Sequence, residues 1–450
     1  MSLAARGLGS AALVACLLLA ACAGAPEPPL TVVPPPPEPP LGTALPAGHT
    51  GYDNRSLARL FGQLTHGTEW GGTRPWLVRY EEPVIIGLEG EGAAQYAPFL
   101  ERFTGYLRRH GGVPIGLGRQ GQNLWVRFVE GPEFRRILPA AACVLVPGNR
   151  SWDAFAADPA RWGGDALLRT DRITAMTVFL PRSAPPHAVR ACLIEEISQA
   201  LGPVNDLYGL GPSIFNDDFA HVWPTRLDLL MLRVLYSEAM ETGLSRPETE
   251  ARAEGVLDAA NPAGRRAPPL PEPIPRGSAG WRARAGEVLR RDLSPIEAEA
   301  RARAALDYAA ELLPGRPEHC HAALTLGRVL ARQAPEAALA ALSDARAVCA
   351  RAHGAEDVRL DWIALERASA LEETGAPDAA LSLTDGLAER FAAHGLDARL
   401  AGTYALRVRA FSALGRAAEA TRAERSARRW AGYALGRENG GFADWLRAGP

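Results

Sequence analysis

The residues of this chain best suited to chemistry lie between positions 195 and 206. Glu195 and Gln199 are four residues apart, which places both side chains on one face of a helix. Two histidines at that spacing would bind one zinc ion, and Glu196 stands where the general base toward the metal-bound water would stand. The segment therefore has the spacing of a zinc helix, with a carboxylate and an amide where imidazole ligands would be.

The segment resembles the metzincin pattern H-E-x-x-H-x-x-G-x-x-H. The three histidines are replaced, in order, by Glu195, Gln199 and Asn205. Glu196 keeps the glutamate, and Gly202 keeps the glycine that lets the chain leave the helix and return a third ligand. The spacing, the glutamate and the glycine of the pattern are retained, while its three histidine ligands are replaced.

Downstream residues extend the resemblance. Ser213, Ile214 and Phe215 are similar to the metzincin Met-turn, with Phe215 in place of methionine, and residues 225–236 are similar to the closing helix of such domains. More narrowly, E-E-I-S-Q-A-L-G followed by N-D, S-I-F-N-D and L-D-x-x-x-L-R-x-L-Y resembles the bacterial family called domain of unknown function 2927. The resemblance covers residues 51–245 and implies an α+β zincin-like domain.

The replaced ligands argue against zinc. Catalytic zinc sites use three protein ligands, mostly imidazole or thiolate, and this set supplies only one good ligand. We therefore expect no zinc and no other cofactor. The resemblance then implies a shared fold more than a shared activity. Glu195 and Gln199 can instead hydrogen-bond across one helical turn. Asn205 or Asp206 would complete that network in place of the metal.

Two alternatives involve the same residues. Oxygen ligands for calcium, magnesium or manganese could come from Glu195, Glu196, Asn205, Asp206, Asp217 and Asp218. Oxygen groups close in sequence are more often solvated turn residues, which favours the structural interpretation. The second alternative, acid/base catalysis on a sugar by Glu195 and Glu196, has less support, because adjacent glutamates point in different directions from a helix.

No other motif competes with this one. The histidines, His221, His353 and His394 among them, are scattered, and His319 and His321 beside Cys320 have no second ligand cluster. Residues 116–121 only superficially resemble a dinucleotide fingerprint, because an alternating strand follows them instead of a helix. We interpret them as a hairpin connection.

The N-terminus predicts the location of the protein. An apolar run follows Arg6 and ends in Leu-Ala-Ala-Cys at Cys22, which resembles a bacterial lipobox. Residues 1–22 would then be a lipoprotein signal peptide, with Cys22 as the acylated anchor. Ala23 in place of aspartate implies delivery to the outer membrane, facing the periplasm. The proline-rich residues 23–50 form a spacer.

The remaining cysteines suit an oxidising compartment. Cys143, Cys192, Cys320 and Cys349 allow three disulfide connectivities. We predict that Cys143, in an apparent strand, pairs with Cys192, on the helix that carries the altered zinc motif. Cys320 and Cys349 lie at the start and end of a helical hairpin, where antiparallel packing would bring them together.

Hydrophobic patterns place these residues in a fold. Strands are predicted at residues 83–88, 124–129, 142–146 and 175–181, with helices at 96–110 and 183–202. The last helix would bury the stripe of Val189, Leu193, Ile197 and Ala200. Glu195 and Gln199 would face a cleft. This is the element order expected of a zincin-like domain.

The C-terminal half is predicted to be helical. Residues 246–280 are interpreted as a linker, residues 281–437 as an all-α helical-repeat domain and residues 438–450 as a tail. Breaks at Gln333, Gly375 and Gly415 recur about every 40 residues, which resembles tetratricopeptide repeats, although alanine-rich helices in a simple bundle can mimic them. Stacked helical hairpins commonly bind a protein partner.

Composition and motifs together favour a binding function. The chain of 450 residues has 47% hydrophobic and 22% charged residues, as in globular proteins, and its net charge of −2 argues against nucleic-acid binding. We expect a lipid-anchored envelope adaptor with a catalytically silent zincin-like domain and a protein partner on its repeats. The alternative is a metal-dependent hydrolase of peptides or cell-wall material with Glu196 as base.

Overall fold

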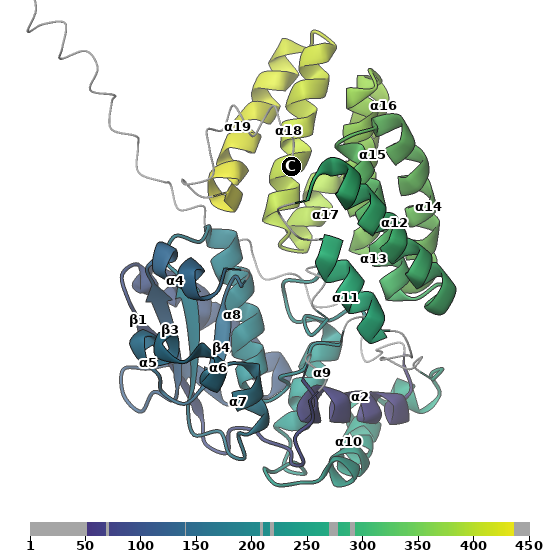
Figure 1. The fold of residues 1–450 in the computed structure, drawn as a ribbon. Helices are drawn as coiled ribbons and strands as arrows, with labels where there is room; N and C mark the ends of the chain where they lie inside the picture. Colours follow the sequence, from purple (N-terminus) through teal and green to yellow (C-terminus); the bar gives the residue numbers. More distant parts are fainter. Residues whose placement is uncertain are drawn as a thin grey trace, which may run out of the picture. The chain divides into compact units, whose positions relative to one another are not determined.

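A mixed α/β region is followed by an all-helical region in the computed structural model (Figure 1). The structure describes residues 52–435, apart from residues 69–71, 140, 208–209, 217–219, 270–277 and 289–292. All described residues belong to one compact unit. The predictions for the signal peptide, Cys22, the spacer and the tail concern residues outside the described ones, as do Asp217 and Asp218.

Five strands form the sheet of the α/β region. They are β1 (Val84–Glu89), β2 (Ile115–Leu117), β3 (Leu124–Val129), β4 (Val144–Pro147) and β5 (Met176–Pro181). Their order is β2-β1-β3-β5-β4, and all pairs are parallel except β4 with β5, so β4 is an antiparallel edge strand. The four predicted strands are confirmed, and β2 is additional.

The interpretation of residues 116–121 as a hairpin connection is wrong. β1 lies between β2 and β3, so the segment passes across the end of β1. The backbone N–H of Gly118 donates to Ile86 O (3.2 Å), and the Asn123 side chain accepts from the Ile85 N–H (2.8 Å). A Cβ on Gly118 would lie 2.5 Å from the Ile85 side chain, so the glycine allows this close passage.

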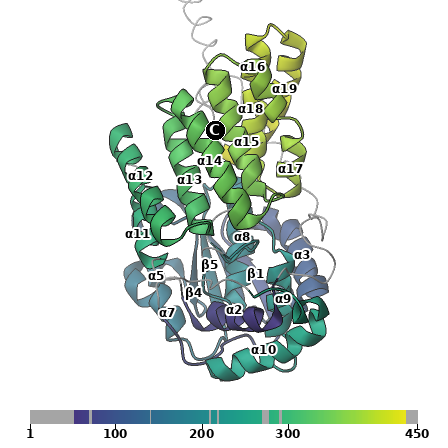
Figure 2. The same cartoon turned by 90° about the vertical axis from the view of Figure 1, so that its right-hand side faces the viewer.

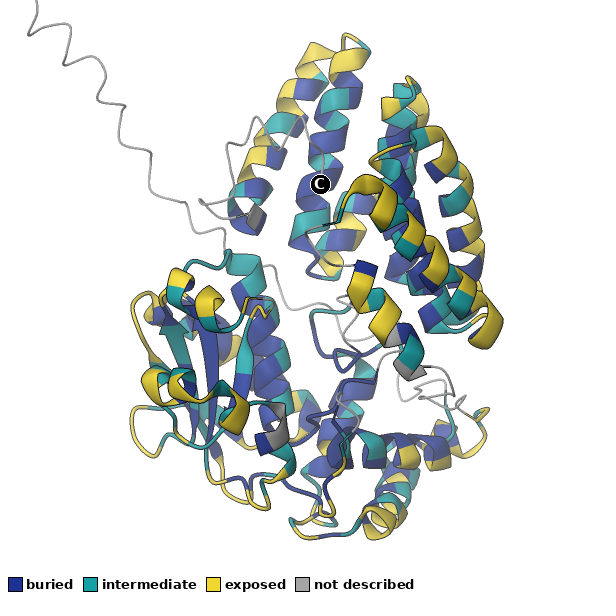
Figure 3. Ribbon diagram, in the orientation of Figure 1, coloured by how far each residue is buried: buried dark blue, intermediate teal, exposed yellow. Residues whose placement is uncertain are grey.

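Helices cover both faces of the sheet. One face packs against α2 (Asn54–His66), α3 (Ala97–Tyr106), α8 (Pro186–Ala200) and α9 (Arg226–Leu235). The opposite face holds a smaller core with α4 (Gly131–Ile137) and α5 (Trp152–Ala157). Strand alternation divides β5 between them, because Val178 and Leu180 enter the first core and Phe179 enters the second. Figure 3 shows the buried strands and α8 in dark blue.

Short helical segments complete the α/β region. They are η2 (Ala93–Tyr96), the π-helical η3 (Leu107–Gly111), α6 (Pro159–Trp162), α7 (Gly164–Leu168) and η4 (Pro262–Arg265). With α3, η3 fills the range predicted as one helix from 96 to 110.

The structure differs from the expected linker over residues 246–280. Its first part forms α10 (Arg246–Ala260), which packs against α2 and buries Thr249, Ala253 and Leu257. Ser245 and Glu248 make a capping box at its start. This S-x-x-E signal is present in the sequence and could have predicted the helix.

Nine helices form the C-terminal region. They are α11 (Ser278–Val288), α12 (Pro295–Leu312), α13 (Pro317–Ala331), α14 (Pro335–His353), α15 (Val358–Glu373), α16 (Pro377–Leu383), α17 (Leu387–Ala393), α18 (Asp397–Ala413) and α19 (Ala417–Leu435) within the described ranges. Helices break at all three predicted places, and Gly375 and Gly415 have left-handed φ angles of 82° and 70°. Figure 2 shows α13, α14 and α15 side by side. No helix in the described part of the chain combines the length and hydrophobicity that a membrane span requires.

Both predicted disulfides are confirmed. Cys143, directly before β4, is bonded to Cys192 on α8, with their Cα atoms 6.0 Å apart. Cys320 on α13 is bonded to Cys349 on α14, with their Cα atoms 4.6 Å apart. The first bond fixes the edge strand to the helix that carries the candidate site.

Candidate functional site

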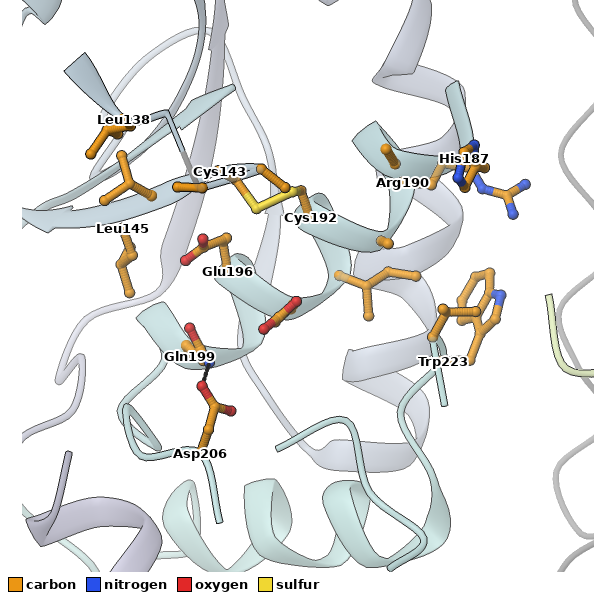
Figure 4. A pocket seen from close by; sticks show the side chains of 18 of the residues that line it. Leu138, Cys143, Leu145, His187, Arg190, Cys192, Glu196, Gln199, Asp206 and Trp223 are labelled. Carbon is orange, nitrogen blue, oxygen red and sulfur yellow. Dashed lines mark hydrogen bonds between the residues drawn. A yellow bond between two sulfur atoms is a disulfide. The ribbon is translucent and has the colours of Figure 1, made fainter. Parts of the chain in front are cut away.

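Helix α8 presents Glu195, Glu196 and Gln199 to a cavity. Its predicted stripe of Val189, Leu193, Ile197 and Ala200 is buried in the core. Glu195 and Gln199 are half-buried and line a cavity of about 830 Å³, together with Glu196 and Asp206 (Figure 4). The prediction that these side chains face a cleft is therefore confirmed.

The side chains of Gln199 and Asn205 bond to different elements. Gln199 Nε2 donates to Asp206 Oδ2 (2.9 Å), which fixes the loop after α8 to the last turn of that helix. Asn205 Nδ2 donates to the Gln63 carbonyl of α2 (2.8 Å). The sequence left open whether Asn205 or Asp206 completes the network with Gln199, and the structure shows that Asp206 does. Asn205 instead bonds to α2, a helix that was not predicted from the sequence.

Among the described residues, no group of three or more His, Cys, Asp and Glu side chains is placed to hold a metal ion. The oxygen-ligated cation considered from the sequence would also draw on Asp217 and Asp218, which lie outside the described residues. The amides of Gln199 and Asn205 and the carboxylate of Asp206 are engaged in hydrogen bonds, and amides suit zinc poorly as ligands.

Gly202 makes the turn that follows α8. Its φ of 139° lies in a region that side chains with a Cβ rarely adopt, and an added Cβ would lie 2.8 Å from the Val78 carbonyl oxygen. The carbonyl of Gly202 accepts from Arg74 Nη2 (2.6 Å), whose Nε donates to Thr65 O (2.7 Å). Burial lowers the pKa of Arg74 to about 10, so it remains charged at neutral pH.

We expect Gly202→Ala to lower the free energy of unfolding by about 2 to 3 kcal/mol, from backbone strain and the contact with Val78. Gly243→Ala is the matched control, because Gly243 also has a positive φ, 103°, but its Cβ would meet no atom within 4 Å. Urea unfolding of both variants separates the two effects. Equal losses would show that the close approach to Val78 contributes nothing.

The turn at residues 213–215 is fixed by a buried carboxylate. Asp228, in the first turn of α9, bonds the Ser213 hydroxyl and accepts from the backbone N–H groups of Ile214 (3.1 Å) and Thr225 (2.7 Å). Burial raises the pKa of Asp228 to about 6, while these donors oppose the rise. Phe215 is fully buried, and its carbonyl accepts from Leu207 N (2.8 Å). The turn therefore supports the loop that carries Asp206.

A buried ion pair that the sequence did not reveal is part of the lining of the cavity. Arg190 Nη2 donates to Asp397 Oδ2 (2.8 Å), joining α8 to the start of α18, with 6% and 0% of the two side chains exposed. Arg190 Nε and Nη1 and Asp397 Oδ1 are buried without a hydrogen-bond partner in the described structure. Burial raises the pKa of Asp397 to about 6, opposed by the Arg190 cation.

Histidines that are scattered in the sequence meet in the structure. The rings of His221 and His394 lie 6.3 Å apart between centroids, edge to face. His353 lies against the backbone of Gly211, where an added Cβ would come within 3.2 Å of its Nδ1. The three residues bring the loop before α9 against the helical region, a contact for which the sequence carries no local signal.

Part of the chain is similar to a known protein family. No curated protein and no solved structure is similar to it. The match to a protein family begins at the first residue of α2 and ends within α10, so it includes the sheet, α8, the 213–215 turn and α9. Residues 54–254 match the model of the family described as Protein of unknown function (DUF2927).

Proposed function

We propose that this chain is a lipid-anchored binding protein of the bacterial cell envelope whose α/β region is a catalytically silent, metzincin-like domain. The order of its elements supports the proposal, since a strand, a helix, further strands and α8 are followed by the 213–215 turn and α9. Glu195, Gln199 and Gly202 occupy α8 and its end as the metzincin resemblance implies.

One observation carries the proposal, namely the hydrogen bonds made at the former ligand positions. Gln199 binds Asp206, and Asn205 binds the Gln63 carbonyl of α2. Each bond joins α8 or its following loop to another segment, which is the structural role that a metal would otherwise have in tying segments together. The site is thereby stabilised without the ion that hydrolysis would require.

The helical region is proposed to be tetratricopeptide-like and to bind a protein partner. Its hairpins α13–α14 and α18–α19 pack closely, and Gly327 allows the approach of Leu342, which would lie 2.4 Å from an added Cβ. Helices α13, α15 and α18 are successive neighbours, as the first helices of stacked repeats would be. Stacks of this kind offer one continuous face to a partner.

An envelope location is supported by the cysteines. Two disulfides fit an oxidising compartment, and Cys22 would provide the anchor at the outer membrane, facing the periplasm. Radiolabelled palmitate incorporation in cells that express the chain, lost in Cys22→Ser, tests this part of the proposal.

Elemental analysis of the purified full chain tests catalytic silence. We expect metal well below one equivalent per chain and no change in melting temperature with a chelator, because two of the three residues at the compared ligand positions, Gln199 and Asn205, are hydrogen-bonded amides. Glu196→Gln should then behave like Glu238→Gln, which changes an exposed glutamate away from the cavity. One equivalent of metal, with a peptidase or cell-wall hydrolase activity that Glu196→Gln abolishes, would establish the hydrolase instead.

A further inference from the structure

The last helix of the described chain, α19, presents a row of arginines to solvent. Its other side packs against α18, with Ala423 and Ala427 buried between the two helices. On the outer side, Arg422, Arg425 and Arg429 are all exposed, and Figure 3 shows exposed residues along this helix in yellow. Spacings of three and four residues place these arginines within about 60° of one another around the helix axis. We call these three residues the α19 arginine face.

The carboxylates of α19 are bonded to other arginines. Glu419 Oε1 lies 2.9 Å from Arg416 Nη2, and Glu424 Oε1 accepts from Arg428 Nη2 (2.6 Å). Arg422 is near enough to Glu419 to interact with its charge but forms no ion pair with it. Within the described ranges, no residue of the α19 arginine face forms an ion pair, so its positive charge is not neutralised by the chain.

Like charges repel one another on the α19 arginine face. Arg425 is three residues from Arg422 and four from Arg429, and like charges at these spacings destabilise a helix. The guanidinium carbon of Arg429 also lies 5.7 Å from the ring centroid of the half-buried Trp430, a contact that leaves the positive charge in place. An anionic partner would relieve the repulsion, so charge complementarity favours such a partner.

The α19 arginine face has no apolar anchor of the kind that protein interfaces use. Such interfaces depend on large apolar or aromatic side chains that become buried at their centre. The exposed large apolar side chains of the described chain are Trp76, Ile296 and Leu312, and none of them lies on α19. A layer of anionic lipid headgroups attracts basic residues through charge alone. The composition of the face therefore favours a membrane surface over an acidic protein.

We propose that the α19 arginine face binds the anionic headgroups of a membrane. The inference rests on the proposed function, because the lipid anchor at Cys22 would hold the chain beside such a surface. The whole chain has a net charge of −2, so its overall charge does not attract it to anionic lipid. Attraction to such a membrane therefore has to come from a local basic surface, and α19 supplies one.

Co-sedimentation with lipid vesicles tests the proposal. Residues 23–450 are used, because they include every described residue but lack the acyl anchor. One set of vesicles is phosphatidylcholine alone, and the other is an equal mixture with anionic phosphatidylglycerol. Each arginine near an anionic surface strengthens binding about fivefold, so we expect at least about tenfold tighter binding to the anionic vesicles. High salt should remove this preference. Equal binding to both sets at low salt would overturn the proposal.

A triple variant locates the contact on α19. Replacing Arg422, Arg425 and Arg429 together by glutamine should reduce the preference for anionic vesicles to about twofold or less, because all three charges of the face are removed. All three side chains are exposed, so the melting temperature should show that the variant is folded. A preference that persists in this variant would show that another surface binds the lipid and would overturn the proposal.

The matched control removes three exposed arginines that do not form one face. Arg346 and Arg351 are five residues apart on α14 and so lie on different sides of that helix, and Arg332 directly follows α13. Replacing these three by glutamine changes the net charge equally and should leave the preference intact. An equal loss in the control would show that net charge decides binding, which contradicts the proposal.

Two further outcomes separate this inference from the proposals on which it rests. Palmitate incorporation without any preference for anionic vesicles would refute the contact through α19 and leave the lipid anchor standing. Binding of polyglutamate by the unaltered chain but not by the α19 triple variant, again without a vesicle preference, would identify an acidic protein as the partner and overturn the membrane contact.

Discussion

Replacing Arg190 with methionine is expected to lower the free energy of unfolding by about 3 to 5 kcal/mol, because it leaves the Asp397 carboxylate buried without its cation. Arg190 Nη2 and Asp397 Oδ2 are 2.8 Å apart, and neither side chain is more than 6% exposed. The loss should therefore far exceed that of an exposed ion pair such as Arg55 with Glu254. Urea unfolding monitored by tryptophan fluorescence measures both.

A double variant separates the pair from the packing around it. Arg190→Met with Asp397→Asn removes both charges, so the uncompensated carboxylate is gone and the combined loss should be smaller than that of Arg190→Met alone. Asp397→Asn alone leaves the Arg190 cation without its partner. If the two single losses simply add in the double variant, the ion pair does not couple α8 to α18.

The loss in Arg190→Met should also depend on pH. In the folded wild type the pKa of Asp397 is raised to about 6 from 3.8, so this group contributes stability at low pH that is lost as pH rises through about 6. Removing the Arg190 cation, which opposes the rise, raises that pKa further. The variant should therefore recover part of its stability between pH 7 and pH 5, where the carboxyl becomes neutral. A loss independent of pH would contradict this explanation.

Regular patterns in the sequence were enough to predict the long strands of the sheet and helix α8. The long strands β1, β3 and β5 have apolar runs bounded by turn residues, and α8 shows its buried stripe directly. β2 was missed because three residues are too few to show a period, and its edge position beside β1 depends on the crossover through α3. Helix α10 was missed because its apolar surface is small and only its capping box marks it.

The site was predictable where its contacts are local. Gln199 and Asp206 are close in sequence, and their bond follows from the turn at Gly202. The partner of Asn205 lies on α2, which the sequence analysis did not predict. The ion pair between Arg190 and Asp397 depends on how α18 packs against α8. No periodicity in the sequence encodes that packing. Long-range polar pairs are the part of this site that a single sequence leaves undetermined.

The second large effect concerns the bond between Cys143 and Cys192. Replacing both by alanine should lower the free energy of unfolding by about 4 kcal/mol, the chain-entropy value for a closed loop of this length. The two cysteines are separated by 49 residues and join the start of β4 to α8. Because β4 pairs with β5 alone in the described sheet, removing the bond should also free this edge strand locally.

Hydrogen exchange distinguishes that local effect from a general loss of stability. The matched control is Cys320→Ala with Cys349→Ala, which opens a loop of 29 residues within α13 and α14 and should cost about 3.5 kcal/mol by the same relation. Amides of β4 and the middle of α8 should exchange faster only in the first double variant, and those of α13 and α14 only in the second. Equal exchange of β4 in both variants would mean that the disulfide does not hold the edge strand against the helix.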